Sequence, residues 1–144
     1  MVNKVWRIER RTVLVAGAAL LGVALMGGAA RCGEQAPWTA PARAAKKANP
    51  IPADEKSLAL GKELFVKNCL SCHGETGKGN GPAAKDLDRS PGDLTNPKMF
   101  EQTVGAIFWK ITEGNKPMLS FENTLTAEER WHIVNYVRTL AKKP

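Results

Sequence analysis

Cys69-Leu70-Ser71-Cys72-His73 is the stretch that decides the fold, because two cysteines and an adjacent histidine form a C-x-x-C-H motif. Two thiols three positions apart on about one helical turn can face the same side and bond the two vinyl groups of a porphyrin. The adjacent His73 then reaches the iron from that side. The motif therefore predicts a covalent attachment site for a haem of the c type.

Paired cysteines also occur in redox-active disulfides and in zinc sites. A thioredoxin-like C-x-x-C pair follows a strand of a βαβ pattern, whereas the residues before Cys69 have helical periodicity. A structural zinc site needs four ligands, and after His73 the sequence contains only His132, far along a predicted helix. We interpret His132 as a surface or packing residue, and the haem interpretation is favoured.

Three amphipathic helices are predicted around the motif. The first covers residues 55–68 and has Asp54 as its N-cap. The second carries apolar residues at i, i+3, i+4 and i+7 from Val104 and ends at Gly114. The third follows Thr126, which forms a capping box with the glutamate three residues later. No strand pattern stands out, so the predicted fold class is all-α.

Two loops contain candidate cofactor residues. Residues 74–97 are rich in Gly and Pro, which suits a backbone that wraps closely around a flat cofactor. Pro82 in this loop holds a carbonyl that can accept a hydrogen bond from the second ring nitrogen of His73. Met99 and Met118 are the two methionines of the domain, and one of them is expected to be the sixth iron ligand, since a thioether suits iron that transfers an electron.

Residues 1–31 are predicted to be a signal peptide or a membrane anchor. Basic residues precede an uncharged run from Thr12 to Ala30. As a helix this run would rise about 28 Å, close to the roughly 30 Å of a bilayer core, and it ends in small residues that suit cleavage. Both alternatives stay open, and both place the remainder on the periplasmic side. Cys32 is a candidate lipid-bearing residue, although Arg31 stands where a small residue is usual.

Residues 32–53 are predicted to be a Pro/Ala-rich linker, which leaves 54–144 as the folded domain. The formal charge is +7, but residues 1–49 hold eight basic and two acidic residues, whereas the remainder holds 13 basic and 12 acidic ones. This asymmetry indicates a targeting segment rather than a nucleic-acid surface. A domain of this size is near the lower limit for a protein-only core, so a large apolar cofactor would stabilise it.

Several short segments together match the pattern of one protein family. They are Gly61-x-x-x-Phe65, Cys69-x-x-Cys72-His73-Gly74, Gly77-x-Gly79-x-Gly81-Pro82-Ala83, Asp93-Leu94-Thr95, Gly114-x-x-x-Met118-x-x-Phe121, and Leu125-Thr126 through Asn135-Tyr136-Val137-Arg138. With these segments the domain resembles the class I cytochromes c, in particular bacterial monohaem proteins related to haem subunits of cbb3-type oxidases and of membrane dehydrogenases. One departure is that Leu119 follows Met118, where the family commonly has proline.

The resemblance implies a class I cytochrome c fold of three to five helices around one covalent haem c. It implies thioether bonds at Cys69 and Cys72, axial ligation of iron by His73 and Met118, and a hydrogen bond from His73 to the Pro82 carbonyl. It also implies that Gly61, Phe65 and Tyr136 lie where the first and last helices cross.

The function implied by this resemblance is one-electron transfer rather than catalysis, because His and Met fill both axial positions of the iron. The expected partners are a donor dehydrogenase or cytochrome complex and an acceptor oxidase or reductase of a respiratory chain. Membrane association would run through the N-terminus, and no nucleic acid is expected. The alternative is a five-coordinate or ligand-labile haem that acts as a sensor or a peroxidase-like enzyme. A third interpretation is a fixed subunit of a respiratory complex.

Overall fold

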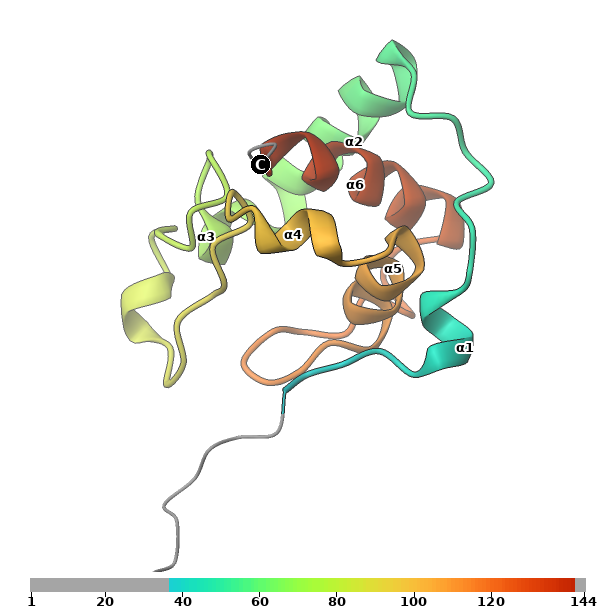
Figure 1. Cartoon of the computed structure of the whole chain (residues 1–144). Helices are drawn as coiled ribbons and strands as arrows, with labels where there is room; N and C mark the ends of the chain where they lie inside the picture. The colour runs from blue at the N-terminus through green and yellow to red at the C-terminus, as the bar shows by residue number, and fades with distance from the viewer. Residues whose placement is uncertain (1–36, 142–144) are drawn as a thin grey trace, which may run out of the picture. The chain divides into compact units, whose positions relative to one another are not determined.

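The computed structural model describes residues 37–141, which lie in one compact unit that begins at Ala36. The helices of this part, in chain order, are α1 (Ala42–Ala45), α2 (Glu55–Asn68), α3 (Leu70–His73), the 3-10 helix η1 (Ala84–Asp86), α4 (Lys98–Glu101), α5 (Val104–Glu113) and α6 (Ala127–Leu140) (Figure 1). Residues 37–141 contain no strand beyond an isolated bridge between Asn115 and Met118. The predicted all-α class is confirmed, and the one-turn helices α1, α3 and α4 bring the α-helices of this part to six.

The three long helices begin where the sequence predicts, because their caps are local. The Asp54 side chain accepts a hydrogen bond from the Ser57 amide at 2.8 Å and so starts α2. At the start of α6, Thr126 Oγ1 accepts from the Glu129 amide and the Glu129 carboxylate accepts from the Thr126 amide, which completes the capping box. Helix α5 ends at Gly114, whose φ of 68° is left-handed and favours glycine.

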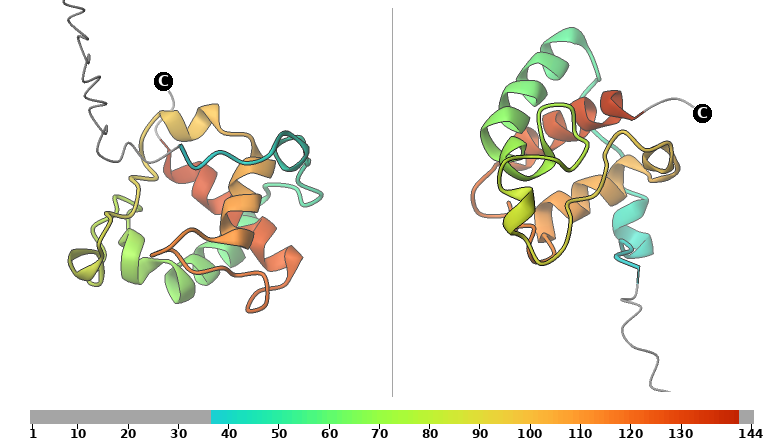
Figure 2. Two further views of the ribbon diagram at one scale, coloured as in Figure 1. Left: turned by 90° about the horizontal axis from the view of Figure 1, so that it is seen from below. Right: turned by 90° about the vertical axis from the view of Figure 1, so that its left-hand side faces the viewer.

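Helices α2 and α6 pack against each other (Figures 1 and 2). Gly61 lies where they cross, as the resemblance implied. A Cβ at Gly61 would lie 2.1 Å from the His132 carbonyl oxygen and 2.9 Å from the Tyr136 Cβ, so only glycine lets the two backbones approach this closely. The rings of Phe65 and Tyr136 pack beside the crossing with centroids 5.4 Å apart. The crossing therefore fixes α2, and with it the C-x-x-C-H motif, against the last helix.

The segment of residues 37–53, here called the N-terminal strap, differs from the linker that the sequence predicts for residues 32–53. Its described residues pack on the domain: Ala40 is buried, and α1 lies along α5 (Figure 2). The backbone of α1 lies so close to Gly105 that a Cβ there would be 2.4 Å from the Ala44 carbonyl oxygen. The predicted membrane segment 1–31 and Cys32 lie outside the described residues, and no helix within residues 37–141 is long and apolar enough to span a bilayer.

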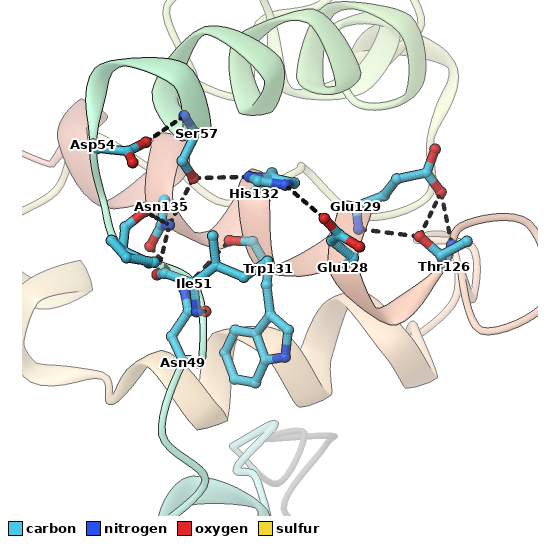
Figure 3. Close-up of polar contacts among 11 residues, drawn as sticks. Asn49, Ile51, Asp54, Ser57, Thr126, Glu128, Glu129, Trp131, His132 and Asn135 are labelled. Carbon is cyan, nitrogen blue, oxygen red and sulfur yellow. Dashed lines mark hydrogen bonds and ion pairs between the residues drawn. The ribbon is translucent and has the colours of Figure 1, made fainter.

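A buried polar network joins the strap to α2 and α6 (Figure 3). Asn135 Nδ2 donates to the carbonyl oxygens of Ile51 and Pro52 and to Ser57 Oγ, and Asn49 Nδ2 donates to Asn135 Oδ1 at 2.7 Å. Ser57 Oγ also lies 2.8 Å from His132 Nδ1. His132 is therefore a buried packing residue, one of the two placements predicted for it.

Candidate functional site

A largely apolar cavity of about 350 Å³ is lined by four of the five predicted site residues, all except Pro82. Cys69, Cys72 and His73 line one part of it, and Met118 lines it from the loop between α5 and α6. Apolar side chains of the core complete the lining, among them Phe65, Leu94, Ile107, Ile111, Ile133 and Val137. The fold thus brings together residues that are 45 positions apart in the sequence.

Helix α3 holds the motif as a single turn. The amides of Cys72 and His73 donate to the Cys69 carbonyl at 3.2 and 2.9 Å, and Gly74, with φ 77°, ends the turn. This conformation is accessible to glycine without strain. One helical turn carries the two cysteines and the histidine on a rigid unit, as their spacing predicts.

The Gly-rich loop after the motif runs back along α3. The amides of Gly79, Gly81 and Ala83 donate to the carbonyls of His73, Cys72 and Ser71 at 2.8, 3.1 and 2.8 Å. A Cβ at Gly81 would lie 2.4 Å from the carbonyl oxygens of Leu70 and Ser71. Glycine at position 81 is therefore needed for close approach to the protein's own backbone, whereas the sequence suggested close approach to the cofactor. Gly92 is a glycine of this loop that lines the cavity.

Pro82 lies between the two anchored residues Gly81 and Ala83 and is not among the cavity-lining residues. The Nδ1 atom of His73 is buried and makes no hydrogen bond with any residue that the structure describes. The hydrogen bond from His73 to the Pro82 carbonyl stays a prediction.

Burial sets the protonation of the motif. It lowers the pKa of His73, and the backbone of Gly92 opposes this shift. A neutral imidazole has a free lone pair for a metal. Burial, with the neighbouring Cys72, raises the pKa of Cys69 to about 12, so its thiol is protonated at neutral pH and poor at disulfide exchange. Cys69 and Cys72 do not form a disulfide with each other.

The two methionines both line the cavity but differ in their surroundings. Met99 Sδ accepts a hydrogen bond from Gln102 Nε2 at 3.1 Å. The sulfur of Met118 makes no hydrogen bond within residues 37–141, and its backbone is held by reciprocal hydrogen bonds with Asn115, each 3.0 Å long. Met118 therefore has its sulfur available in a fixed loop, while the sulfur of Met99 already has a partner.

These residues fit a covalent haem. The two cysteines on one helical turn without a disulfide between them, the adjacent imidazole of His73 and the apolar lining are what the group requires. In contrast, the described part of the chain has no group of three His, Cys, Asp or Glu residues able to hold a metal ion, so it gives no support to a zinc site.

The cavity also contains residues that sequence reasoning did not assign to it. Trp38, Gln102 and Lys110 line it, as does Arg89, which donates hydrogen bonds to the carbonyl oxygens of Asn115 and Lys116 in the Met118 loop. A single tryptophan in a Pro/Ala-rich segment was a sequence signal that the segment packs against the domain, because so large an apolar side chain is rarely left in solvent. No comparable sequence signal predicts that Gln102, Lys110 and Arg89 line the cavity.

Comparisons with known proteins agree with this site. Residues 56–137 match the family model described as cytochrome C oxidase, cbb3-type, subunit III. The chain is 37% identical over 83 residues to cytochrome c6 of Microcystis aeruginosa, an alignment that covers 58% of this chain and 96% of the relative.

Solved structures of other proteins are also similar to this chain. The KustC0563 c-type cytochrome is 26% identical, with a TM-score of 0.50, over 57% of this chain and 98% of that one. A chain of the Kuenenia stuttgartiensis reducing HAO-like protein complex Kustc0457/Kustc0458 is 28% identical, with a TM-score of 0.58 over 65% of this chain. The present chain spans about half of that one, 47%. The chain therefore belongs to the cytochrome c family described as cbb3-type cytochrome c oxidase subunit III, and it is a class I monohaem domain with one covalent haem c.

Proposed function

We propose that this cytochrome is a one-electron carrier whose haem iron has His73 and Met118 as axial ligands and whose haem is bound through Cys69 and Cys72. The observation that carries the proposal is that these four residues line one apolar cavity. With both axial positions taken by protein, no coordination site is left for a substrate, which favours electron transfer over catalysis.

The haem, when bound, supplies a reversible one-electron change at its iron. The residues of the chain keep the surroundings of the haem constant during that change. Burial lowers the pKa of His73, which favours the neutral imidazole that ligation needs, and the lining of the cavity is largely apolar. Leu119 lines the cavity and is 72% exposed, so the cavity meets the surface beside Met118. This opening is where we expect electrons to enter and leave.

We further propose that residues 1–31 direct the domain to the periplasmic side of the cytoplasmic membrane and that it works there in a respiratory or dehydrogenase chain. The support is the basic segment followed by the uncharged run in the sequence. The Kuenenia relative comes from a protein complex, which makes a fixed place in a redox complex a specific alternative to a mobile carrier.

Absorption spectroscopy of the purified holoprotein tests the carrier proposal. We expect a Met–iron charge-transfer band in the ferric form and slow binding of CO by the ferrous form. Absence of the band together with rapid CO binding would refute six-coordination and support the sensor or peroxidase-like alternative.

Cell fractionation with intact mass measurement tests the location. A haem-loaded chain recovered with its N-terminal residues in the membrane fraction supports anchoring. A shortened haem-loaded chain in the soluble periplasmic fraction supports a cleaved signal peptide, and a haem-loaded chain in the cytoplasm contradicts export.

A further inference from the structure

The N-terminal strap brings an aromatic side chain to the wall of the haem cavity. Trp38 lines the cavity together with Gln102, which directly follows α4, and Lys110 of α5. The family model matches residues 56–137, so Trp38 lies outside the part of the chain that is shared with the family. The role of Trp38 is therefore inferred from its contacts.

Several specific contacts hold the strap in place. Thr103 Oγ1 donates to the Ala45 carbonyl at 2.6 Å, and Gly105 allows the backbone of α1 to approach α5. The Lys47 ammonium lies 4.7 Å from the ring centroid of Phe108, which is a cation–π distance. Asn49 adds the hydrogen bond to Asn135. Contacts along α5 and α6 thus fix the strap, and the position of Trp38 follows from it.

The Trp38 ring contacts Lys110, the first member of a chain of polar contacts that reaches Met99. The Lys110 ammonium lies 5.2 Å from the Trp38 ring centroid and donates to Gln102 Oε1 at 2.6 Å. Gln102 Nε2 in turn donates to the Met99 sulfur. Lys110 is itself partly buried, and this burial lowers its pKa.

We propose that Trp38 is a positioning residue of the haem site that limits the access of water to the cavity beside Lys110 and thereby raises the reduction potential. The physical reason is that the oxidised haem carries one more positive charge than the reduced haem, and a drier site disfavours the charged form. The inference rests on the proposed one-electron function, because it concerns the equilibrium between the two redox states.

The test uses the full-length, haem-loaded chain and the variants Trp38→Ala, Trp38→Phe and Trp109→Ala. Trp109 is the matched control, since its ring packs against Trp38 with centroids 6.3 Å apart but does not line the cavity. In Trp38→Ala we expect the ferric-to-ferrous ratio at a fixed applied potential to rise at least threefold, which equals a fall in midpoint potential of about 28 mV for one electron. Trp38→Phe is expected to recover most of the native ratio, and Trp109→Ala to keep it within about 1.5-fold of native.

Two outcomes would overturn the proposal: a native ratio in Trp38→Ala, or an equal rise in Trp38→Ala and Trp109→Ala, which would indicate general loosening of the strap. Circular dichroism and the ferrous haem spectrum of each variant verify that fold and haem content are unchanged. If Trp38→Ala fails to fold, the ratio in Trp38→Phe decides, and a fall below the native ratio contradicts the proposal. Failure of the carrier function would instead appear in the native protein, as a missing Met–iron band.

Discussion

At the scale of single residues, the two methionine sulfurs of the cavity are distinguished by what they contact. Met99 Sδ is hydrogen bonded to Gln102, whereas Met118 Sδ makes no hydrogen bond with the described residues. Both side chains line the cavity, so position alone does not separate them. The contacts favour Met118 as the iron ligand.

Met118→Ala is therefore expected to remove the Met–iron charge-transfer band and to lower the midpoint potential, because loss of the thioether removes the ligand that favours ferrous iron. Met99→Ala is the matched control and should keep the band. Absorption spectra and redox titration of both variants measure this. The reverse pattern would assign the ligand to Met99.

At the scale of helices, the crossing of α2 and α6 depends on the missing side chain of Gly61. We expect Gly61→Ala to lower the free energy of unfolding by about 1–3 kcal/mol, because the added Cβ meets the backbone of His132 and the helices must separate. Lys62→Ala, at the exposed next position of α2, should change it by less than about 0.5 kcal/mol. Denaturant unfolding of the two holoproteins gives both values, and equal effects would contradict the close approach.

The N-terminus of α6 depends on its capping box. Thr126→Ala is expected to cost about 1 kcal/mol of unfolding free energy, because the Glu129 amide loses its acceptor. Thr124→Ala, in the exposed turn just before the helix, is the control and should be nearly neutral. Thermal and denaturant unfolding measure the difference, and equal losses in the two variants would mean that the cap contributes nothing.

The same capping box makes a pH-dependent contribution to the free energy of unfolding. Hydrogen bonds from the backbone and side chain of Thr126 lower the pKa of Glu129 below its ordinary value of 4.5. The unfolded state then binds more protons than the folded state, so this contribution is complete above pH 4.5 and is lost as the pH falls through the lowered folded value. Unfolding free energies measured between pH 7 and pH 3 should therefore fall more in the native protein than in Glu129→Gln. Parallel curves would show that the box does not titrate in this range.

At the scale of the whole molecule, the core is built around the cavity. Phe65, Ile107 and Ile133 are buried core residues and also line it, so apolar surface is left without a protein partner when the haem is absent. A small domain of this kind gains much of its stability from such a cofactor.

The double variant Cys69→Ala, Cys72→Ala is expected to lose the covalent haem and, with it, cooperative unfolding. Intact mass reports the bound haem and circular dichroism the unfolding transition. Cys32→Ala is the control and should retain one haem, because this cysteine is outside the motif. A haem that stays covalently bound in the double variant would contradict the assignment of the thioether residues.

The sequence by itself determined the local features. Each of these features involves residues within a few positions of each other, so a short sequence pattern is enough to predict it. They are the caps at Asp54 and Thr126, the end of α5 at Gly114 and the C-x-x-C-H turn. The pairing of Gly61 with Tyr136 came from family resemblance, and the structure confirms it.

Only the tertiary structure decided which distant residues line the cavity. The strap has the composition of a linker, yet Thr103, Gly105 and Asn135 bind it to α5 and α6 and bring Trp38 to the cavity wall. The close approach of Gly81 to α3 was likewise visible only in three dimensions. The physical reason is that these contacts join segments distant in sequence, and the free energy that holds them comes from burial and hydrogen bonds that exist only once the whole chain has packed.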